Sequence, residues 1–326
     1  MSQRRLLVTG GSGFIGANFI LDANRRGEYE LLNLDLAPPK FEANHVTHRY
    51  CDILNREMVE RCFAEFQPND VVHFAGRTDM FGSNVNDYAA NHFGTKNVIT
   101  AIQRISSVEK AVFTSSQFVV GPGALPEHEE EFRPHTIYGE SKVLSERAVR
   151  DADLVCTWTI IRPTNIWGRW HPRYPSEFWR VLKQGRYFHP GGRPVIRCYG
   201  YVGNVVQQVL TILARKHDDL NRRVIYVGDA PIDLHDWTNA FSLCLTGKPV
   251  RVVPRPLVKT LAKFGDVVQG CGGNFPIYSS RFRSMTEDYE TPMDETFDVL
   301  GPSRISLEKG VRETAEWLRT EDDFWS

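Results

Sequence analysis

The stretch IYGESK, residues 137–142, places a tyrosine four residues ahead of a lysine where a helix is expected to begin. Positions four apart lie on one face of a helix, so Tyr138 and Lys142 can point at the same spot. A lysine charge held near a phenol favours the phenolate, which would let Tyr138 exchange a proton below its ordinary pKa of about 10. Alone, such a pair is usually part of a solvated helix face. Proton transfer by Tyr138 is therefore a hypothesis that other motifs have to support.

A glycine-rich stretch, TGGSGFIG, gives that support because it follows the first strand-like run and opens a helix-like one. Glycines at this spacing permit a tight turn, close approach of the backbone to a pyrophosphate, and a helix N-terminus that faces the anion. Asp35 ends the second strand-like run, where a carboxylate can accept hydrogen bonds from a ribose and would repel a 2′-phosphate. The pattern favours NAD over NADP, although Asp35 could also be a simple strand-end cap. The predicted cofactor-binding residues here are Gly10, Gly13, Phe14, Ile15, Gly16 and Asp35.

The elements that would position these residues alternate between short β-branched runs and helical stretches. This alternation predicts βαβ units, and hence an α/β fold in which a doubly wound parallel sheet of the Rossmann type has helices on both faces. Strands are expected in RRLLVTG, YELLNLDL, NDVVHFAG, VEKAVFTSS, CTWTIIRP and RRVIYVGD, with a long helix over residues 85–104.

After residue 165 the alternation is lost, and a smaller mixed substrate lobe is expected. We predict an NAD-binding domain over residues 1–165, to which segments near 195–230 return, and a lobe over most of 166–326. The tryptophans and tyrosine in IWGRWHPRYPSEFW could either stack on a ligand or form the core of this lobe. The segment PRPLVKTLAKFGDVV has helical apolar spacing, which indicates a helix packed on the lobe or one that touches a membrane or a lipophilic ligand.

The bulk composition is that of an ordinary globular protein, with 326 residues, 41% hydrophobic content and a formal net charge of -1. This charge does not indicate a nucleic-acid-binding surface. No apolar run is long enough to cross a membrane and no signal peptide is recognisable, so a cytoplasmic protein is expected. The six cysteines lack metal or disulfide spacing, and no metal site is predicted.

Several further motifs fall in a familiar order: CDI at 51–53, HFAG at 73–76, NHFGT at 91–95, FTSS before YGESK, and RPTNIWG at 162–168. Together with TGGSGFIG and Asp35, they make the sequence similar to the extended short-chain dehydrogenase/reductases, in the nucleotide-sugar epimerase and dehydratase branch, over nearly the whole chain. The resemblance implies an NAD-dependent enzyme in which Tyr138 is the base that takes a proton from an alcohol and, in reverse, the acid. Lys142 would then lower the pKa of Tyr138 and bind the nicotinamide ribose.

The resemblance also implies roles for residues outside the first two motifs. Asp52 and Ile53 would flank the adenine, Ala75 and Gly76 would lie along the cofactor, and Asn91 would lie beneath the sheet near the active site. Ser116 would hydrogen-bond the reacting oxygen, although Ser115 could share that role because the end of the strand is uncertain by a residue. The substrate diphosphate would be held by Asn165 and Arg197, with Arg281 or Arg283 as a second phosphate contact.

The reaction type is narrowed by the two residues after Ser116. Related 4,6-dehydratases have an Asp-Glu pair there, whereas this chain has Gln117 and Phe118, which cannot move a proton. Hydride transfer at a carbinol is therefore expected, most simply a nucleoside-diphosphate-sugar 4-epimerase that works through a 4-keto intermediate. Three alternatives stay open: a keto-sugar oxidoreductase, an enzyme similar to the 3β-hydroxysteroid dehydrogenases, and a silent NAD-binding regulator. By the same resemblance we expect a homodimer formed through helices over 85–104 and 138–150.

Overall fold

A computed structural model describes residues 3–123, 125–216 and 219–321, and its centre is a seven-stranded sheet. The strands lie in the order β11-β6-β5-β4-β1-β2-β3, and every neighbouring pair is parallel. This arrangement confirms the predicted Rossmann-type α/β fold. The strands are β1 (Arg4–Thr9), β2 (Tyr29–Asp35), β3 (Val46–Tyr50), β4 (Asp70–His73), β5 (Lys110–Thr114), β6 (Thr157–Pro163) and β11 (Arg223–Val227).

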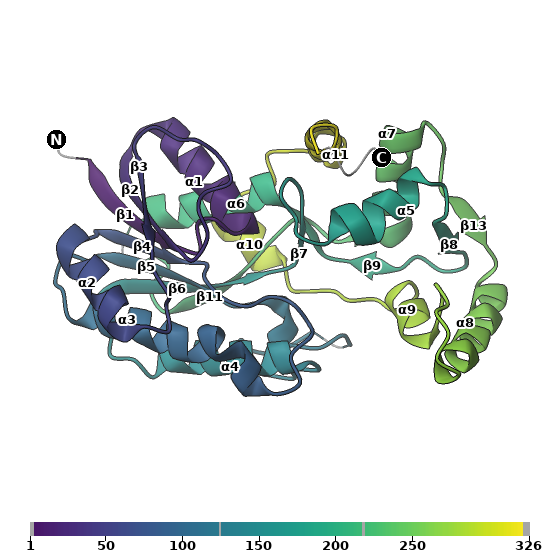
Figure 1. Ribbon diagram of the computed structural model, residues 1–326, viewed down its shortest axis with the longest axis horizontal. Helices are drawn as coiled ribbons and strands as arrows, with labels where there is room; N and C mark the ends of the chain where they lie inside the picture. Colours follow the sequence, from purple (N-terminus) through teal and green to yellow (C-terminus); the bar gives the residue numbers. More distant parts are fainter. Residues whose placement is uncertain (1–2, 124, 217–218, 322–326) are drawn as a thin grey trace.

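Helices cover both faces of the sheet because the strand residues alternate between two apolar layers (Figure 1). Leu6 and Val8 of β1 face one core, whereas Leu7 between them faces the other. The first core is covered by α1 (Phe14–Arg26) and α6 (Val202–Ala214), and the second by α2 (Arg56–Phe66), α3 (Thr95–Gln103) and α4 (Ile137–Arg150). The segments near 195–230 thus supply α6 and β11 to the sheet domain.

Two elements differ from the predictions. Strand β3 was not expected, because it lies at the edge of the sheet and its residues VTHRY form no apolar run. The helix expected over 85–104 is not continuous, since a 3₁₀ turn (Val85–Tyr88) and a π turn (Ala90–Gly94) precede α3. Asn91 lies in the π turn, a kind of irregularity that often marks functional sites.

The smaller lobe is built on a core of aromatic side chains. Trp167 and Trp179 are fully buried against Phe241, and Trp237 stacks on Tyr199 with ring centroids 4.2 Å apart. Of the two interpretations of the Trp-rich segment, the core interpretation therefore holds for these tryptophans. The lobe contains β7 (Asn165–Trp167), β8 (Phe188–Pro190), β9 (Ile196–Arg197), β10 (Tyr199–Tyr201), β12 (Ile232–Asp233), β13 (Arg251–Val253), α5 (Arg180–Lys183), α7 (Leu234–Thr246), α8 (Arg255–Gly270) and α9 (Ser279–Ser284).

The chain then returns to the sheet domain as α10 (Asp294–Leu300), and α11 (Leu307–Leu318) follows it. Helix α10 contacts β11 and α6, while α11 packs on α7 of the lobe. No helix in the described ranges is long and apolar enough to cross a membrane.

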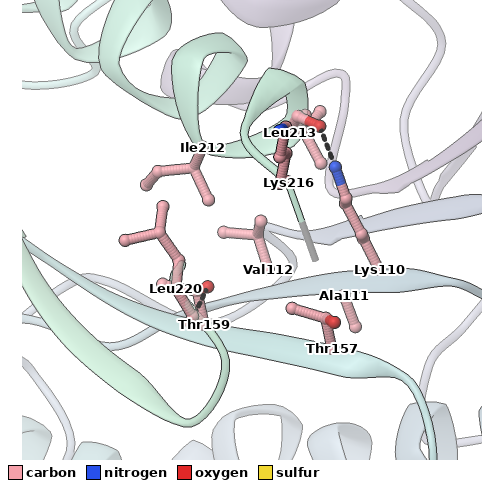
Figure 2. A pocket seen from close by; sticks show the side chains of 9 residues that line it. All are labelled: Lys110, Ala111, Val112, Thr157, Thr159, Ile212, Leu213, Lys216 and Leu220. Atoms are coloured by element: carbon pink, nitrogen blue, oxygen red, sulfur yellow. Dashed lines mark hydrogen bonds between the residues drawn. The ribbon is translucent and has the colours of Figure 1, made fainter. Parts of the chain in front are cut away.

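Two hollows lie away from the residues predicted to do chemistry. Figure 2 shows one of about 10 Å³ between α6 and the strands β5 and β6, where Lys110 Nζ donates to Leu213 O at 2.6 Å. Its volume suits a single water at most. A groove of about 560 Å³ lies between α1, α6 and α11, lined by both arginines and glutamates, and none of the predicted site residues borders it.

Candidate active site

The tyrosine and lysine of the YGESK motif lie on the first two turns of α4, at the carboxyl edge of the sheet. Thr136 begins the helix by accepting a hydrogen bond from Gly139 N at 3.0 Å. The Tyr138 side chain is buried next to Phe118 and Tyr88, and its hydroxyl is hydrogen-bonded to Ser116. The structure thus brings Ser116 and Tyr138 together from two different elements.

The neighbouring serine points elsewhere. The Ser115 hydroxyl donates to Glu146 Oε1 at 2.5 Å, and Glu146 also accepts from Arg162 Nε at 2.8 Å. Both charged side chains are almost completely buried, so their pairing offsets the large cost of removing two charges from water. Of the two serines considered, Ser116 rather than Ser115 meets the tyrosine.

Lys142 lies in the same buried region, and its Nζ donates to Thr114 O at 2.8 Å. Burial lowers the pKa of Lys142 to about 8, while the charge of Glu146 opposes that change. Burial raises the pKa of Tyr138 to about 12, although the hydrogen bond from Ser116 favours the phenolate. The expectation that Lys142 lowers the pKa of Tyr138 therefore stays a prediction, and burial of the phenol acts on that pKa in the opposite direction.

Asn91 ties the segment after β4 to the catalytic helix. Its Oδ1 accepts from Arg77 N at 2.7 Å, and its Nδ2 donates to Arg77 O and Ser141 Oγ. A Cβ on Gly76 would lie 2.7 Å from Asn91 Oδ1 and 3.4 Å from Lys142 Nζ. The glycine therefore allows Asn91 and Lys142 to approach the same piece of backbone.

The glycine-rich turn after β1 has the geometry of a phosphate cradle. Gly10 has a φ of 73°, and a Cβ there would lie 2.5 Å from Ala75 N. A Cβ on Gly16 would lie 2.2 Å from Gly10 O. Helix α1 begins at Phe14 without a side-chain cap, so its first N–H groups remain available to an anion. The turn fits a pyrophosphate of the kind that NAD carries.

The predicted ribose and adenine contacts lie at the adjacent strand ends. Asp35 accepts from Ser12 N at 2.9 Å and from Ala37 N at 3.0 Å, which holds its carboxylate at the end of β2 next to the glycine-rich turn. Cys51 N donates to Asp35 O, so Asp52 and Ile53 follow directly beside that strand end. These positions fit an adenosine whose ribose meets Asp35.

The predicted phosphate contacts come from the lobe. Asn165 opens β7, which pairs with β10, and its N–H donates to the backbone oxygen of Cys198, the residue after Arg197. Arg197 Nη2 donates to Ser284 O at 2.7 Å and Glu287 O at 2.9 Å, while its buried Nε has no partner among the described residues. Arg281, by contrast, donates to Pro276 O at 2.7 Å and lies over the Tyr278 ring. The structure thus places Asn165 and Arg197 on neighbouring strands of the lobe and directs Arg281 to a different contact.

Sequence reasoning missed Tyr289, which links the lobe to the loop that follows Ser116. Its backbone forms a bridge with Arg197, and its hydroxyl donates to Val120 O at 2.7 Å and Gln117 O at 3.3 Å. No motif surrounds it, so no signal in the sequence separates it from the other tyrosines. Glu146 was missed too, although its position one helical turn after Lys142 is a usable signal.

The described residues contain no cluster of three or more His, Cys, Asp or Glu side chains that could hold a metal ion. The model of the NAD dependent epimerase/dehydratase family matches residues 6–228, which include the glycine-rich turn, Ser116, Tyr138 and Lys142. The chain belongs to this family. It is therefore an enzyme of the extended short-chain dehydrogenase/reductase type, and its cofactor is NAD.

Two curated relatives of the chain are hydroxysteroid enzymes by name. The 3-beta-hydroxysteroid dehydrogenase of Mycolicibacterium neoaurum is 33% identical over 232 residues, which is 65% of this chain and 61% of the relative. The 3 beta-hydroxysteroid dehydrogenase/Delta 5-->4-isomerase of Mycobacterium tuberculosis is 34% identical over 257 residues, 72% of this chain and 67% of the relative. The match thus spans only about two thirds of either protein's length.

Solved structures similar to the chain include enzymes that are named for sugar nucleotides. The UDP-glucose 4-epimerase of Thermus thermophilus, solved with NAD, shares 25% identity, with a TM-score of 0.69 over 97% of this chain and 99% of that chain. The Thermotoga maritima UDP-glucose 4-epimerase, solved with UDP-glucose, shares 20% identity with a TM-score of 0.74 over the same two fractions. At 20% identity the likeness shows the fold alone.

Proposed function

We propose that this enzyme is a 4-epimerase of a nucleoside-diphosphate sugar and that it works through a transient 4-keto sugar. The observation that carries the proposal is that Tyr138 and Ser116 lie together at the sheet edge. The backbone of Arg197 bridges to Tyr289, whose hydroxyl bonds to Gln117 O in the loop that follows Ser116. A proton-transfer group and a phosphate-binding group at the two ends of one site suit a sugar diphosphate.

The proton step follows from the hydrogen bonds. Ser116 would hold the substrate hydroxyl against Tyr138, whose phenol oxygen takes the hydroxyl proton as the carbon–oxygen double bond forms. Bound NAD would supply the acceptor for the hydride that leaves the carbon. Lys142 keeps one donor on Thr114 O and has two further N–H donors for the phenol oxygen or a ribose. Return of the hydride to the other face of the ketone, with the proton returned by Tyr138, completes the epimerisation.

The residues after Ser116 support hydride transfer without elimination. Gln117 is completely buried, and Phe118 stacks on His135 with ring centroids 5.3 Å apart. Neither side chain can protonate a leaving hydroxyl. Loss of water from the sugar is therefore not part of the proposed reaction.

The environment of Arg197 supports a diphosphate at the far end of the substrate. The guanidinium is held by two backbone carbonyls, and no carboxylate in the described part of the chain pairs with it. The nearby Asp288 carboxylate, whose pKa the charge of Arg197 helps to lower, is ion-paired with Arg193 instead. A fixed cation that forms no ion pair of its own is suited to bind a phosphate oxygen.

The second candidate is net oxidation of a hydroxysteroid-like substrate. The names of the two curated relatives favour it, as does the exposed apolar side of α8 at the end of the lobe. The same Ser116, Tyr138 and Lys142 would serve this chemistry, and Arg197 would then have no phosphate to bind.

The deciding experiment incubates the enzyme with a panel of UDP- and dTDP-sugars and follows the C4 proton by NMR. We expect one epimer pair to equilibrate, and Arg197→Ala should lower kcat/KM by about 10²-fold or more. Arg215→Ala is the matched control, because Arg215 also donates to a backbone carbonyl, Val299 O, but lies at the end of α6. No epimerisation of any sugar nucleotide, with oxidation of a 3β-hydroxysteroid, would overturn the proposal.

A second measurement separates epimerisation from net oxidation or reduction. The protein is purified without added cofactor and denatured, and NAD is assayed in the supernatant. We expect release of close to one NAD per chain, because an epimerase retains its reduced cofactor between the two hydride transfers. Cofactor that binds and leaves freely would favour the oxidoreductase.

We also propose that the protein is a cytoplasmic homodimer that acts on a small molecule. All six cysteines are free thiols, which suits a reducing compartment. Phe93 in the π turn and Leu144 on α4 are exposed on elements that pack against each other, which supports a second copy at that surface.

A further inference from the structure

Helix α8, Arg255–Gly270, lies at the end of the small lobe farthest from the sheet (Figure 1). One side of the helix packs on the lobe through Val258 and Ala262. Gly265 belongs to the same side, where a Cβ would lie 1.9 Å from Ile277 O. This packed side fixes the direction in which the other two sides of α8 face.

The second side of α8 exposes apolar side chains to solvent. Leu257, Leu261 and Phe264 are 61%, 36% and 57% exposed, and their spacing of four and three residues places them in one stripe. Val267, which is 64% exposed, borders the stripe one turn after Phe264. Of the fourteen large hydrophobic side chains exposed among the described residues, five fall between Val252 and Val267. This clustering differs from the scattered single exposures that are normal on a protein surface.

The third side of α8 is basic. Lys259 and Lys263 are four residues apart and have no carboxylate partner in the described ranges. Asp266, the one acidic residue of the helix, already accepts hydrogen bonds from the backbone and side chain of Ser279. Residues 248–263 contain five basic and no acidic side chains in a chain whose formal net charge is -1. Positive charge is therefore concentrated on α8, on the side of the helix that faces away from the apolar stripe.

We propose that α8 docks the protein on the surface of an anionic phospholipid bilayer. The stripe of Leu257, Leu261 and Phe264 would enter the boundary between headgroups and acyl chains, and Lys259 and Lys263 would meet the lipid phosphates. A helix with separate apolar and lysine-bearing sides has the features of peripheral membrane anchors. The attachment is peripheral, since no described helix is long enough to span a bilayer.

Charge favours a lipid surface over a second copy of the chain as the occupant. Two copies packed through this helix about a twofold axis would bring their lysine rows close together, with Asp266 as the one acidic side chain of each helix to offset them. An anionic headgroup layer supplies the missing negative charge. The inference does not depend on the proposed function, because α8 contains none of the proposed site residues.

The test is co-sedimentation of the full-length protein with vesicles, either of phosphatidylcholine alone or of equal parts phosphatidylcholine and phosphatidylglycerol. We expect binding to the anionic vesicles, weakened by high salt because surface charges are screened. The double variant Leu257→Ser/Phe264→Ser should lower the bound fraction about tenfold, and so should Lys259→Glu/Lys263→Glu. Leu243→Ser on α7 is the matched control, since it removes another exposed leucine from the same lobe and should not change binding.

Each variant is first checked for an unchanged melting temperature, so that lost binding cannot come from unfolding. The proposal is overturned if the wild-type protein binds neither vesicle, or if the α8 variants bind as well as the wild type. It is also overturned if light scattering shows that Leu257→Ser/Phe264→Ser separates a dimer while the wild-type protein ignores vesicles, because a second copy would then cover the stripe. Loss of vesicle binding with unchanged turnover of a soluble substrate would leave the proposed function intact.

Discussion

The side chains at the centre of the site are buried, and burial sets their proton affinities. Tyr138 and Lys142 both favour the neutral form more than in water, with pKa values of about 12 and about 8. Each shift has desolvation as its largest cause, so a positive charge brought close to the phenol has a strong effect in this poorly screened region. At the scale of the residue, the tyrosine is positioned for proton transfer but depends on charge from its surroundings to ionise.

Removal of the Tyr138 hydroxyl should separate catalysis from cofactor binding. We expect Tyr138→Phe to lower kcat by about 10²–10⁴-fold, the usual contribution of a positioned acid or base. The NADH dissociation constant, measured by fluorescence titration, should stay nearly constant because the ring remains packed against Phe118 and Tyr88. An unchanged kcat would assign the proton transfer to another group.

Acid should weaken the fold through His73. This buried histidine hydrogen-bonds Thr9 and Thr95, and burial lowers its pKa to about 3. Histidine in the unfolded chain has a pKa of about 6.5, so between pH 6.5 and pH 3 the unfolded state binds more protons than the folded state. The free energy of unfolding therefore decreases as the pH is lowered through this range. We expect the free energy of unfolding to decrease by about 2 kcal/mol through His73 when the pH is lowered from 7 to 5.

The measurement is urea denaturation at both pH values for the wild type and for His73→Gln, whose amide can keep both hydrogen bonds but does not titrate. The variant should show a pH dependence smaller by about the same 2 kcal/mol. Equal dependence in both proteins would mean that His73 does not control the acid response.

At the scale of the element, regular features with apolar patterns could be predicted and irregular ones could not. Six of the seven sheet strands are apolar runs that the sequence indicates directly, whereas β3 is a partly exposed edge strand without such a run. The π turn around Asn91 depends on hydrogen bonds to Arg77 and Ser141, which are distant in sequence. Contacts of that kind, like those of Tyr289 and of Arg162 with Glu146, arise only when the chain is folded.

The turn between β1 and α1 should tolerate no side chain at its last glycine. A methyl group at Gly16 would lie 2.2 Å from Gly10 O, which must then move away from the cofactor position. We expect Gly16→Ala to weaken NADH binding at least about tenfold in a fluorescence titration. Gly270→Ala is the control, because a Cβ there meets nothing within 4 Å. Equal affinity in both variants would show that the turn does not hold the cofactor.

At the scale of the whole molecule, fold class and cofactor could be predicted because they depend on motifs in a fixed order along the chain. The substrate could not, because its proposed contacts come from the lobe, where Asn165 and Arg197 follow no regular pattern and Arg281 points to Pro276. The family membership leaves the same question open, since the similar proteins are named for sugar nucleotides and for hydroxysteroids.

The proposed dimer gives a prediction at this scale. We expect light scattering to report twice the mass of one chain, with the π turn and α4 of each copy in contact. Phe93→Glu/Leu144→Glu would place four buried carboxylates in that interface and should produce monomers. A dimer of unchanged mass would mean that the copies meet elsewhere. The variant Phe81→Glu, at an exposed phenylalanine outside both elements, is the control for the added charge and should remain a dimer.

The return of α6 and β11 to the sheet also limits how this protein can be recombined. Their residues lie between segments of the small lobe, and β11 forms the sheet edge beside β6. A chimera that exchanges everything after residue 165 would therefore replace an edge strand and a covering helix together with the substrate contacts. New specificity is more easily transplanted in two pieces, one on each side of residues 202–227. Helix α10 stays from the parent because it contacts β11 and α6, so the parent sheet remains intact.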